Sequence, residues 1–375
     1  MFNRSVNIAA ISKRTKAKKL ALLLPAHNEE LIIQATIKSA IASGQSPHDI
    51  FVVDDCSSDN TRQKALQLLP LSNVLTVQRS GKARAVMLAI LHFNITVRYG
   101  WLHIADADSV FGRDYFRIFR KNLSPRYIAA IGFVQSMKGN WISKYRVYEY
   151  TYGQNITRRI QSWLHMITVL PGPVTCLRTD ILERLDFTAE SLTEDFDITL
   201  QIHRAKLGRI KFIREAINYT QDPRTYRDFV KQNERWFRGY FQGIRRHKIG
   251  TRLQRIDLGI GYQLFEMTLY SFQLFVIYPV ILVANFSLQT FLGLLIGDAV
   301  IFFSLVFVSA MYARRPSVLF AFPSFYILRT AQLFIYLKAF IEVILLRQYQ
   351  GQTIGWETAG RRYQLSQKAL SEMAV

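Results

Sequence analysis

The stretch Val52-Val53-Asp54-Asp55-Cys56-Ser57-Ser58-Asp59-Asn60-Thr61 decides the fold, because a short apolar run ends there in two carboxylates. Ile50–Val53 predicts a buried strand, and the polar residues 57–59 are of the kind that begin a helix. A strand that passes directly into a helix is the repeating unit of a parallel α/β sheet. Asp54 and Asp55 then lie at the carboxyl end of a strand, where such sheets bind ligands. Capping of the following helix explains these two carboxylates equally well.

The same alternation of apolar and amphipathic runs extends from Leu20 to about Arg214. Short apolar runs predict strands, and amphipathic runs predict helices. The predicted strands are Leu20–Leu24, Ile50–Val53, Val74–Val77 and Trp101–Ile104, and the predicted helices are Ile33–Ala42 and Thr61–Leu69. We therefore expect a mostly parallel α/β sheet whose strand-end carboxylates converge on one crevice.

A second acidic cluster, Asp106-Ala107-Asp108, follows one of the predicted strands. In an extended segment, residues i and i+2 face the same way, so both carboxylates are expected to reach one cation and the diphosphate that it neutralises. Mg²⁺ or Mn²⁺ would suit such oxygen ligands. The alternative is a strand-end turn with solvated aspartates, because two aspartates at this spacing often occur by chance.

Two further charged groups suit the chemistry of a phosphorylated substrate. Lys82 follows a flexible glycine and is able to reach phosphates, although the full phosphate-loop pattern is missing. Thr193-Glu194-Asp195 precedes a periodic apolar segment, which predicts a loop that leads into a helix. A carboxylate in that loop is able to take a proton from an acceptor hydroxyl, whereas Glu194 alternatively serves as a negative charge at the helix N-terminus.

Gln232, Arg235 and Trp236 are spaced i, i+3 and i+4, which places them on one face of a helix. Arginine is able to hold a departing diphosphate, and the indole offers a flat surface to a sugar ring. The alternative is an interface helix with a snorkelling arginine and a tryptophan at the level of the membrane surface.

Composition narrows the class of protein. The chain has 375 residues, 50% of them hydrophobic, and a formal net charge of +21. Such a charge suits nucleic acid, anionic lipid or a phosphorylated substrate. We expect no nucleic-acid partner, because no nucleic-acid-binding module is recognisable. Cys56 and Cys176 give neither a disulfide framework nor a zinc spacing, and both are expected to be buried thiols.

The hydrophobic residues concentrate late in the chain. Leu258 to Asn285, Leu288 to Tyr312 and Val318 to Leu346 are each long enough to cross a bilayer. Charged residues interrupt the third segment, which is alternatively a helix lying in the interface. The pair Arg314-Arg315 favours a cytoplasmic loop and therefore a cytoplasmic catalytic domain in an integral membrane protein.

The expected organisation has four parts. Residues 1–19 form a basic arm, 20–250 a catalytic domain with interface helices, 251–350 a transmembrane region and 351–375 a tail. The basic stretches Arg158 to Trp163 and Phe237 to Lys248 are expected to be amphipathic helices that contact anionic headgroups. Spans ahead of the catalytic domain are not predicted, which limits the protein to a small channel.

Taken together, the motifs resemble glycosyltransferase family 2, in particular the membrane-integrated group of cellulose, chitin, hyaluronan and poly-N-acetylglucosamine synthases. The matching passages run in the family's order: Pro25-Ala26-His27-Asn28-Glu29-Glu30, residues 52–61, Gly81-Lys82-Ala83, Ala105-Asp106-Ala107-Asp108-Ser109, Leu192-Thr193-Glu194-Asp195 and Gln232 to Trp236. The resemblance implies a GT-A fold, a nucleotide-diphosphate sugar donor and inversion at the anomeric carbon. One departure is Ala85-Val86-Met87, where the family often has Ala-Leu-Asn.

Roles follow from the resemblance, position by position. Donor binding is implied for Pro25, Ala26, Asn28, Glu29, Asp54, Asp55, Lys82, Asp106 and Asp108. Of these, Asp106 and Asp108 would hold the metal, with Asp108 favoured as the direct ligand. Asp195 would be the general base, with Glu194 beside it. The acceptor sugar and the diphosphate would contact Gly172, Gln232, Arg235 and Trp236.

The expected function is therefore inverting, metal-dependent transfer of a hexose or N-acetylhexosamine from a UDP-sugar to a growing polysaccharide at the membrane. Transfer of a single sugar to a polyprenyl phosphate or a glycolipid is the nearest alternative. A non-catalytic membrane subunit that senses sugar nucleotides is an alternative from another class. An oligomer or an export partner is compatible with each of them.

Overall fold

The structure is a computed structural model that describes residues 19–187, 191–284, 287–349 and 364. The described residues form two compact units, one containing 19–137 and 169–221 and the other 138–168 and 222–349. Most of the arm expected at 1–19 and of the tail expected at 351–375 lies outside the described residues.

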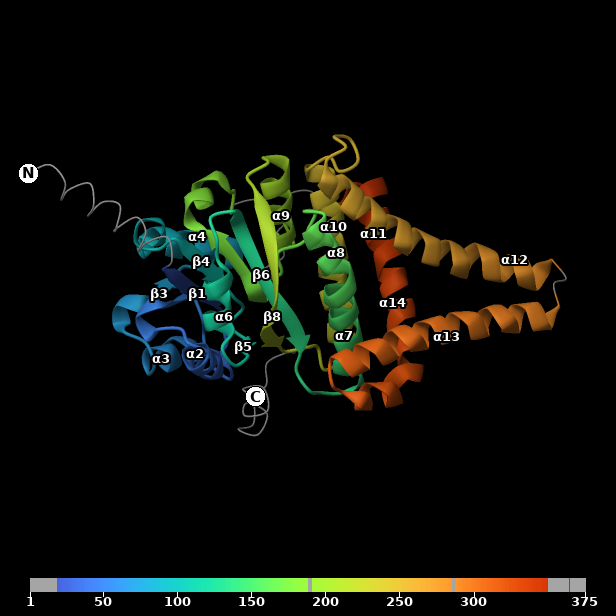
Figure 1. Ribbon diagram of the computed structural model, residues 1–375, viewed down its shortest axis with the longest axis horizontal. Coiled ribbons are helices and arrows are strands. Elements are labelled where there is room, and N and C mark those ends of the chain that lie inside the picture. Colours follow the sequence, from blue (N-terminus) through green and yellow to red (C-terminus); the bar gives the residue numbers. More distant parts are fainter. Residues whose placement is uncertain (1–18, 188–190, 285–286, 350–363, 365–375) are drawn as a thin grey trace, which may run out of the picture. The chain divides into compact units, whose positions relative to one another are not determined.

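The described part of the first unit is built on one mixed sheet of eight strands (Figure 1). The strands are β1 (Leu20–Ala26), β2 (Ile50–Asp55), β3 (Val74–Val77), β4 (Trp101–Ile104), β5 (Val110–Phe111), β6 (Tyr127–Ser136), β7 (Thr175–Arg178) and β8 (Arg209–Thr220). Their order in the sheet is β3-β2-β1-β4-β7-β6-β8-β5. The first four strands are parallel, whereas β7 is antiparallel to both of its neighbours and β5 is antiparallel to β8. The prediction of a mostly parallel sheet therefore holds for the first half, and the second half is mixed.

Helices cover this sheet, which explains why its strands read as continuous apolar runs. Every residue of β1 and β2 is buried. The helices of this unit are α2 (Ile33–Ala42), α3 (Thr61–Leu66), α4 (Lys82–His92), α5 (Ile95–Arg98), α6 (Tyr115–Asn122) and α9 (Glu194–Arg204). The prediction for α2 is confirmed at both ends, but α3 ends three residues before the predicted Leu69, where the chain approaches Pro70.

The strand order places the charged motifs at one edge of the sheet. β1 pairs with β2 on one side and with β4 on the other. The chain adds β2 and β3 on one side of β1 and then crosses to the other side to add β4, so the strand order switches between β1 and β4. Ligands bind to α/β sheets at the carboxyl ends of strands flanking such a switch point. Ala26, Asp54 and Asp106 all stand at or just beyond the carboxyl ends of these strands.

The second unit is helical. Its helices are α7 (Trp141–Tyr152), α8 (Arg158–Trp163), α10 (Tyr226–Arg246), α11 (Arg255–Phe272), α12 (Tyr278–Val283), α13 (Leu288–Tyr312) and α14 (Phe322–Phe340). π-helical turns at Gly153–Thr157 and Gln273–Ile277 join α7 to α8 and α11 to α12. Interior contacts between α7, α13 and α14 bury Ile142, Tyr145, Phe302 and Phe325.

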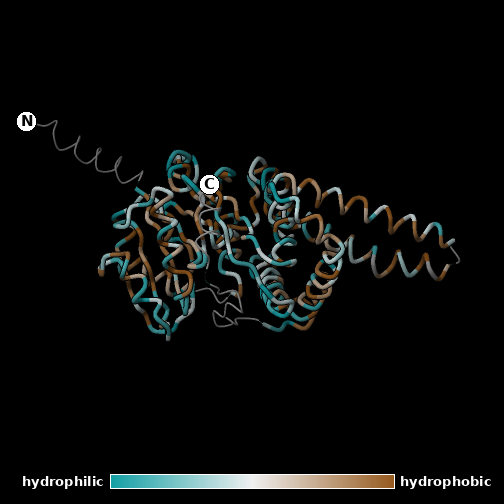
Figure 2. Tube along the Cα trace, turned by 90° about the horizontal axis from the view of Figure 1, so that it is seen from below, coloured by the Kyte–Doolittle hydropathy of each residue, from teal (hydrophilic) through white to brown (hydrophobic). Residues whose placement is uncertain are grey.

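Three helical segments of this unit are long and apolar enough to cross a membrane: Arg255–Ile281, Leu288–Tyr312 and Pro316–Leu345. The prediction of three such segments is confirmed. Figure 2 shows hydrophobic residues along the outer parts of these helices. Large apolar side chains such as Phe265 and Ile296 are exposed there, by 63% and 62%, which suits lipid better than water.

Candidate active site

The loop after β1 is bonded to the loop after β2. Asn28 has a φ of 53°, and its Oδ1 accepts a hydrogen bond from Ser58 N at 2.7 Å. Glu29 is buried, and its backbone N–H donates to Thr61 Oγ1 at 2.7 Å. The neighbouring Pro25 and Ala26 belong to β1 itself. The structure thus brings these four predicted donor-binding residues to the same strand edge as the aspartates of β2.

Asp54 and Asp55 have different surroundings, although both are buried. Asp54 Oδ1 accepts a hydrogen bond from Ser57 N at 3.2 Å, so this carboxylate caps the turn after β2. Asp55 reaches instead to the loop before α4, where it accepts hydrogen bonds from Ser80 N at 2.7 Å and Gly81 N at 3.0 Å. Asp55 therefore fixes the position of the glycine that precedes Lys82.

The two cysteines differ in exposure. Cys176 is buried in β7, as predicted, but Cys56 is exposed. The prediction of a buried thiol at Cys56 is wrong because the chain turns immediately after β2, where Cys56 adopts a φ of 58°.

Lys82 binds two carboxylates at the first residue of α4. Its Nζ lies 2.7 Å from Asp106 Oδ1 and 2.8 Å from Glu194 Oε1. Only 14% of its side chain is exposed. Burial alone would lower the pKa of Lys82, but the negative charges of Asp106 and Glu194 outweigh it, so that this pKa stands above its ordinary value. The ammonium is therefore positively charged at neutral pH.

Asp106 and Asp108 lie in a turn. The hydrogen bond from Ser109 N to Asp106 O, at 3.1 Å, closes the turn directly after β4. The expectation of an extended segment is wrong, and the strand-end turn given as the alternative is the one found, so the alternation of side chains along a strand does not apply here. Asp106 pairs with Lys82, whereas Asp108 is buried, with 6% of its surface exposed.

Glu194 and Asp195 occupy the first turn of α9 rather than the loop predicted for them, and the alternative position of Glu194 at the helix N-terminus, where negative charge is favourable, is the one found. Asp195 Oδ2 accepts a hydrogen bond from Gly172 N at 3.2 Å, and its Oδ1 accepts one from Phe196 N at 2.8 Å. Lys82, Gly172, Glu194 and Asp195 line one small cavity of about 30 Å³. The cavity thus joins the start of α4, the start of α9 and the turn that precedes β7.

Gly172 is in close contact with this cluster. A Cβ atom at this position would lie 2.9 Å from Lys82 Nζ and 3.3 Å from Asp106 Oδ1. The distance of 2.9 Å between this Cβ and Lys82 Nζ is too short for an ordinary contact. A side chain here would make the Lys82 ammonium shift, so glycine is what lets the backbone approach the charged side chains without moving them, which the sequence pattern did not reveal.

The remaining predicted residues, Gln232, Arg235 and Trp236, lie on α10 in the second unit, which confirms their helical placement. Arg146, which sequence reasoning missed, contacts both Gln232 and Trp236. Arg146 of α7 is 1% exposed, donates to Gln232 Oε1 at 2.8 Å and lies 4.8 Å from the centre of the Trp236 ring. Glu149, one turn later, pairs with Arg146 at 2.6 Å, and this i, i+3 spacing is the signal in the sequence.

The carboxylates at this strand edge are the candidate ligands for a divalent cation. Among the described residues, no group of three or more histidine, cysteine, aspartate or glutamate side chains gathers at one point. Asp106 and Asp108 offer two carboxylates separated by one residue. Mg²⁺ is usually held by one or two carboxylates together with water and substrate phosphates, so this pair fits a cation that arrives with a diphosphate.

A mixed α/β sheet that carries such a charged cluster at the carboxyl ends of its strands suits a glycosyltransferase with the GT-A fold. The chain belongs to glycosyl transferase family group 2, whose family model matches residues 101–335. The GT-A fold predicted from the resemblance is thereby confirmed, as is the assignment of the protein as an enzyme.

Similar proteins agree with this assignment. A probable glycosyltransferase of Bacillus subtilis (strain 168), YdaM, is 28% identical over 247 residues, which cover 59% of this chain and 55% of that protein. A poly-beta-1,6-N-acetyl-D-glucosamine synthase of Staphylococcus epidermidis is 26% identical over 248 residues, covering 64% of this chain and 58% of the synthase. The chain thus spans a little over half the length of these relatives.

The fold has a counterpart among solved structures. The mannosyltransferase PcManGT from Pyrobaculum calidifontis, in complex with GDP-Man and Mn²⁺, has a TM-score of 0.56 and 18% sequence identity. The match covers 82% of this chain and 86% of that one. This likeness concerns the fold.

Proposed function

We propose that the chain is an inverting, metal-dependent glycosyltransferase of the membrane, which adds a hexose or N-acetylhexosamine from a UDP-sugar to a growing polysaccharide. One observation carries this proposal. Lys82, Glu194 and Asp195 line one cavity, and Asp106 lies against Lys82. A cation for phosphates and a carboxylate for a hydroxyl proton therefore stand at the same strand edge.

The donor is expected to bind at this edge through its diphosphate. Asp106 and Asp108 would hold a Mg²⁺ or Mn²⁺ ion, which would neutralise the charge of the leaving diphosphate. Lys82 supplies a positive charge from the protein itself. Because the cavity of about 30 Å³ is far smaller than a nucleotide sugar, the donor must lie in the crevice outside it, and Lys82 must exchange part of its contact with Asp106 and Glu194 for the diphosphate. Asp54 and Asp55, with the loop Pro25 to Glu29, would border the nucleoside.

Asp195 is proposed as the general base. Its two oxygens accept hydrogen bonds from Gly172 N and Phe196 N, which orient the carboxylate. The acceptor hydroxyl gives its proton to Asp195 while its oxygen bonds to the anomeric carbon. The bond from that carbon to the diphosphate oxygen breaks in the same displacement, so the configuration inverts. Glu194, held by Lys82, is proposed to set the position of the lysine rather than to take the proton.

The acceptor is proposed to be a polysaccharide. The relatives named poly-beta-1,6-N-acetyl-D-glucosamine synthase support this choice. Trp236 and Arg235 are proposed to contact the acceptor sugar and the diphosphate, with Gln232 held in place by Arg146. The proposed division into a catalytic domain at 20–250 and a transmembrane region at 251–350 places this motif just before the first span.

The catalytic domain is proposed to face the cytoplasm. Arg314 and Arg315 follow the span Leu288–Tyr312, and basic residues favour the cytoplasmic side of a membrane. Nucleotide sugars are made on that side. Cysteine accessibility at position 317, in a variant with both native cysteines replaced, checks the orientation: labelling by a membrane-impermeant reagent in inverted vesicles alone is expected.

Product size tests the function. Membranes that contain the full chain are incubated with each of several radiolabelled UDP-sugars, with and without a chelator. A ladder or a high-mass product, lost on chelation and restored by Mg²⁺ or Mn²⁺, is expected with one donor. A single species that extracts into organic solvent would show transfer to a lipid instead, and nucleotide binding without turnover would show a sensor.

A further inference from the structure

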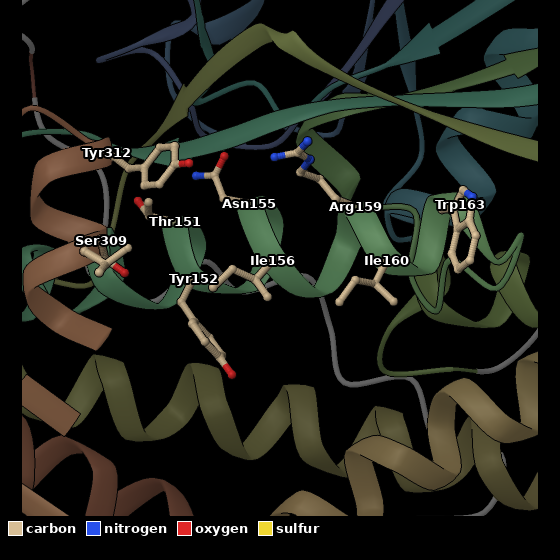
Figure 3. Close-up of a pocket in the computed structure, with 10 residues that line it drawn as sticks. Thr151, Tyr152, Asn155, Ile156, Arg159, Ile160, Trp163, Ser309 and Tyr312 are labelled. Carbon is tan, nitrogen blue, oxygen red and sulfur yellow. The ribbon is translucent and has the colours of Figure 1, made fainter. Parts of the chain in front are cut away.

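A groove in the second unit is lined by none of the residues proposed for catalysis (Figure 3). It has a volume of about 600 Å³ and lies between α13 and the continuous helix formed by α7, the π-helical turn and α8. π-helical turns of this kind are rare and often occur at functional sites. The volume suits an organic molecule, because ligand sites commonly measure about 300–1,000 Å³.

One wall of the groove is apolar. Ile156, Ile160 and Trp163 are exposed by 42%, 50% and 80%, and Figure 3 shows their side chains along the same side of the helix as Tyr152. Val308 adds an apolar side chain from α13. Such a row of exposed apolar residues is suited to an acyl chain.

The other wall carries polar atoms that lack protein partners. Thr151 Oγ1 and Asn155 Oδ1 are buried and make no hydrogen bond within the described part of the chain. Leaving such atoms unsatisfied is costly, so a ligand with hydrogen-bonding groups is favoured at this wall. Figure 3 shows Arg159 on the same side of the helix as Asn155. The guanidinium of Arg159 adds a positive charge to this polar wall.

The groove meets α13 near the end of a candidate span. Ser309 and Tyr312 line it, and the segment Leu288–Tyr312 ends at the second of them. Tyrosine and tryptophan are common where a span meets the aqueous phase. If α13 crosses the bilayer, as proposed above, the groove opens at the level of the lipid headgroups.

We propose that this groove binds an anionic phospholipid of the surrounding bilayer. One acyl chain lies along Ile156, Ile160 and Val308, and the headgroup phosphate pairs with Arg159. A headgroup hydroxyl donates to Asn155 Oδ1. A polysaccharide does not match the apolar wall, and a free phosphate leaves that wall uncovered. The inference rests on the proposed membrane location and is independent of the proposed sugar transfer.

Native mass spectrometry of the full chain in detergent tests this site. The probes are phosphatidylglycerol and phosphatidylcholine with identical acyl chains. Phosphatidylglycerol has both a net negative charge and free hydroxyls, so we expect one bound molecule and a preference of about tenfold over phosphatidylcholine, the size expected for a hydrogen bond between charged groups. Arg159→Gln is expected to remove this preference.

The matched control is Arg227→Gln, which removes the same charge from an exposed arginine of α10 outside the groove. It is expected to leave the preference unchanged. An equal loss in both variants would show that net charge attracts the lipid, and full retention in Arg159→Gln would also overturn the site. Thr151→Val, which keeps the shape of the side chain, is expected to weaken lipid retention without changing charge.

Two further experiments distinguish a bound lipid from a bound free phosphate, and the lipid site from the proposed membrane location. An excess of inorganic phosphate is expected to leave the lipid bound, whereas its displacement would show a site for a free anion. Release of the chain from membranes by alkaline carbonate would refute the membrane location itself. Because the readout is the mass of a bound lipid, loss of glycosyl transfer leaves this result unaffected.

Discussion

Lys82 Nζ lies 2.7 Å from Asp106 Oδ1, which ties the first residue of α4 to the turn after β4. Asp55 holds the backbone of the preceding residue, Gly81, through a hydrogen bond of 3.0 Å. The carboxyl ends of β2 and β4 are thus joined through the adjacent residues Gly81 and Lys82. This lysine also reaches Glu194 at the start of α9, so its loss affects three elements of the site at once.

Lys82→Met is expected to weaken donor binding about tenfold or more, because a charged partner of the diphosphate is removed. It also leaves Asp106 and Glu194 without the charge between them, which lowers stability. Donor affinity is measured by titration with the nucleotide, and stability by thermal unfolding in detergent.

The control is the double variant Lys82→Met with Glu194→Gln. Removing one carboxylate relieves the repulsion, so stability should recover by an amount typical of coupled neighbours, about 0.5–3 kcal/mol, while donor affinity stays low. Recovery of both quantities would contradict a role of Lys82 in binding the diphosphate.

Asp195→Asn keeps the size of the side chain and an oxygen able to accept from Gly172 N, but it removes the base. The transfer rate is expected to fall about 10²- to 10⁴-fold, with nucleotide affinity nearly unchanged. Initial rates at saturating donor, alongside nucleotide titration, separate these effects. Full activity in this variant would end the assignment of Asp195.

Gly172→Ala is expected to lower activity while the chain still folds. The added methyl would lie 2.9 Å from Lys82 Nζ and 3.3 Å from Asp106 Oδ1, so the ion pair must shift. Gly153→Ala is the matched control, because no atom lies within 4 Å of a Cβ at that position. Equal rates for the two variants would show that the close approach at Gly172 does not matter.

The sequence predicted the elements best where local pattern alone determines them. The sequence showed clear bounds for the apolar runs of β1 and β4 and for the periodic segment of α2. A position at a helix start was also one of the two alternatives for Glu194. The antiparallel placement of β7 between β4 and β6 was not predictable, because pairing direction depends on contacts between distant segments. The residues that sequence reasoning assigned to the strand edge of the first unit do lie there.

Contacts that depend on tertiary packing were missed for the same reason. The spacing of Asp106 and Asp108 left an extended segment and a strand-end turn both open, and it did not indicate that Asp108 would be buried. The sequence also did not indicate that Lys82 pairs with Glu194 as well as with Asp106, since Lys82 and Glu194 are far apart in the chain. Arg146 carries a weak signal in its i, i+3 pairing with Glu149, which does not identify Gln232 as its other partner.

His103 is expected to make stability depend on pH. It is fully buried in β4, and burial lowers its pKa from 6.5 to about 3. Below pH 6.5 the unfolded chain binds a proton that the folded chain does not. The free energy of unfolding therefore falls with falling pH, by about 1.4 kcal/mol per unit, until the folded histidine is protonated near pH 3.

The variant His103→Gln tests this dependence because it retains hydrogen-bonding capacity toward Tyr115 without titrating. Tyr115 and Cys176, which face the imidazole, stay neutral over this range because burial raises the pKa of each. Unfolding is followed in detergent between pH 7 and pH 5. The slope for the variant is expected to be shallower than for the parent chain, and equal slopes would contradict a buried, neutral His103.

Arg146→Lys is expected to lower transfer about tenfold while keeping the buried positive charge, because an ammonium lacks the planar fork that serves Glu149 and Gln232 together. Arg146→Met goes further and leaves Glu149 without its partner, at a cost in stability of about 3–5 kcal/mol. The exposed substitution Arg227→Lys is the control for both. If Arg146 acts by holding Gln232, Arg146→Lys should shorten the polysaccharide product and leave the donor KM unchanged. The double variant Arg146→Lys with Gln232→Leu should then lose little more transfer activity than either single variant. A changed donor KM at constant product length would instead place the effect of Arg146 on donor binding, because Gln232 and Trp236 are the groups proposed to meet the acceptor.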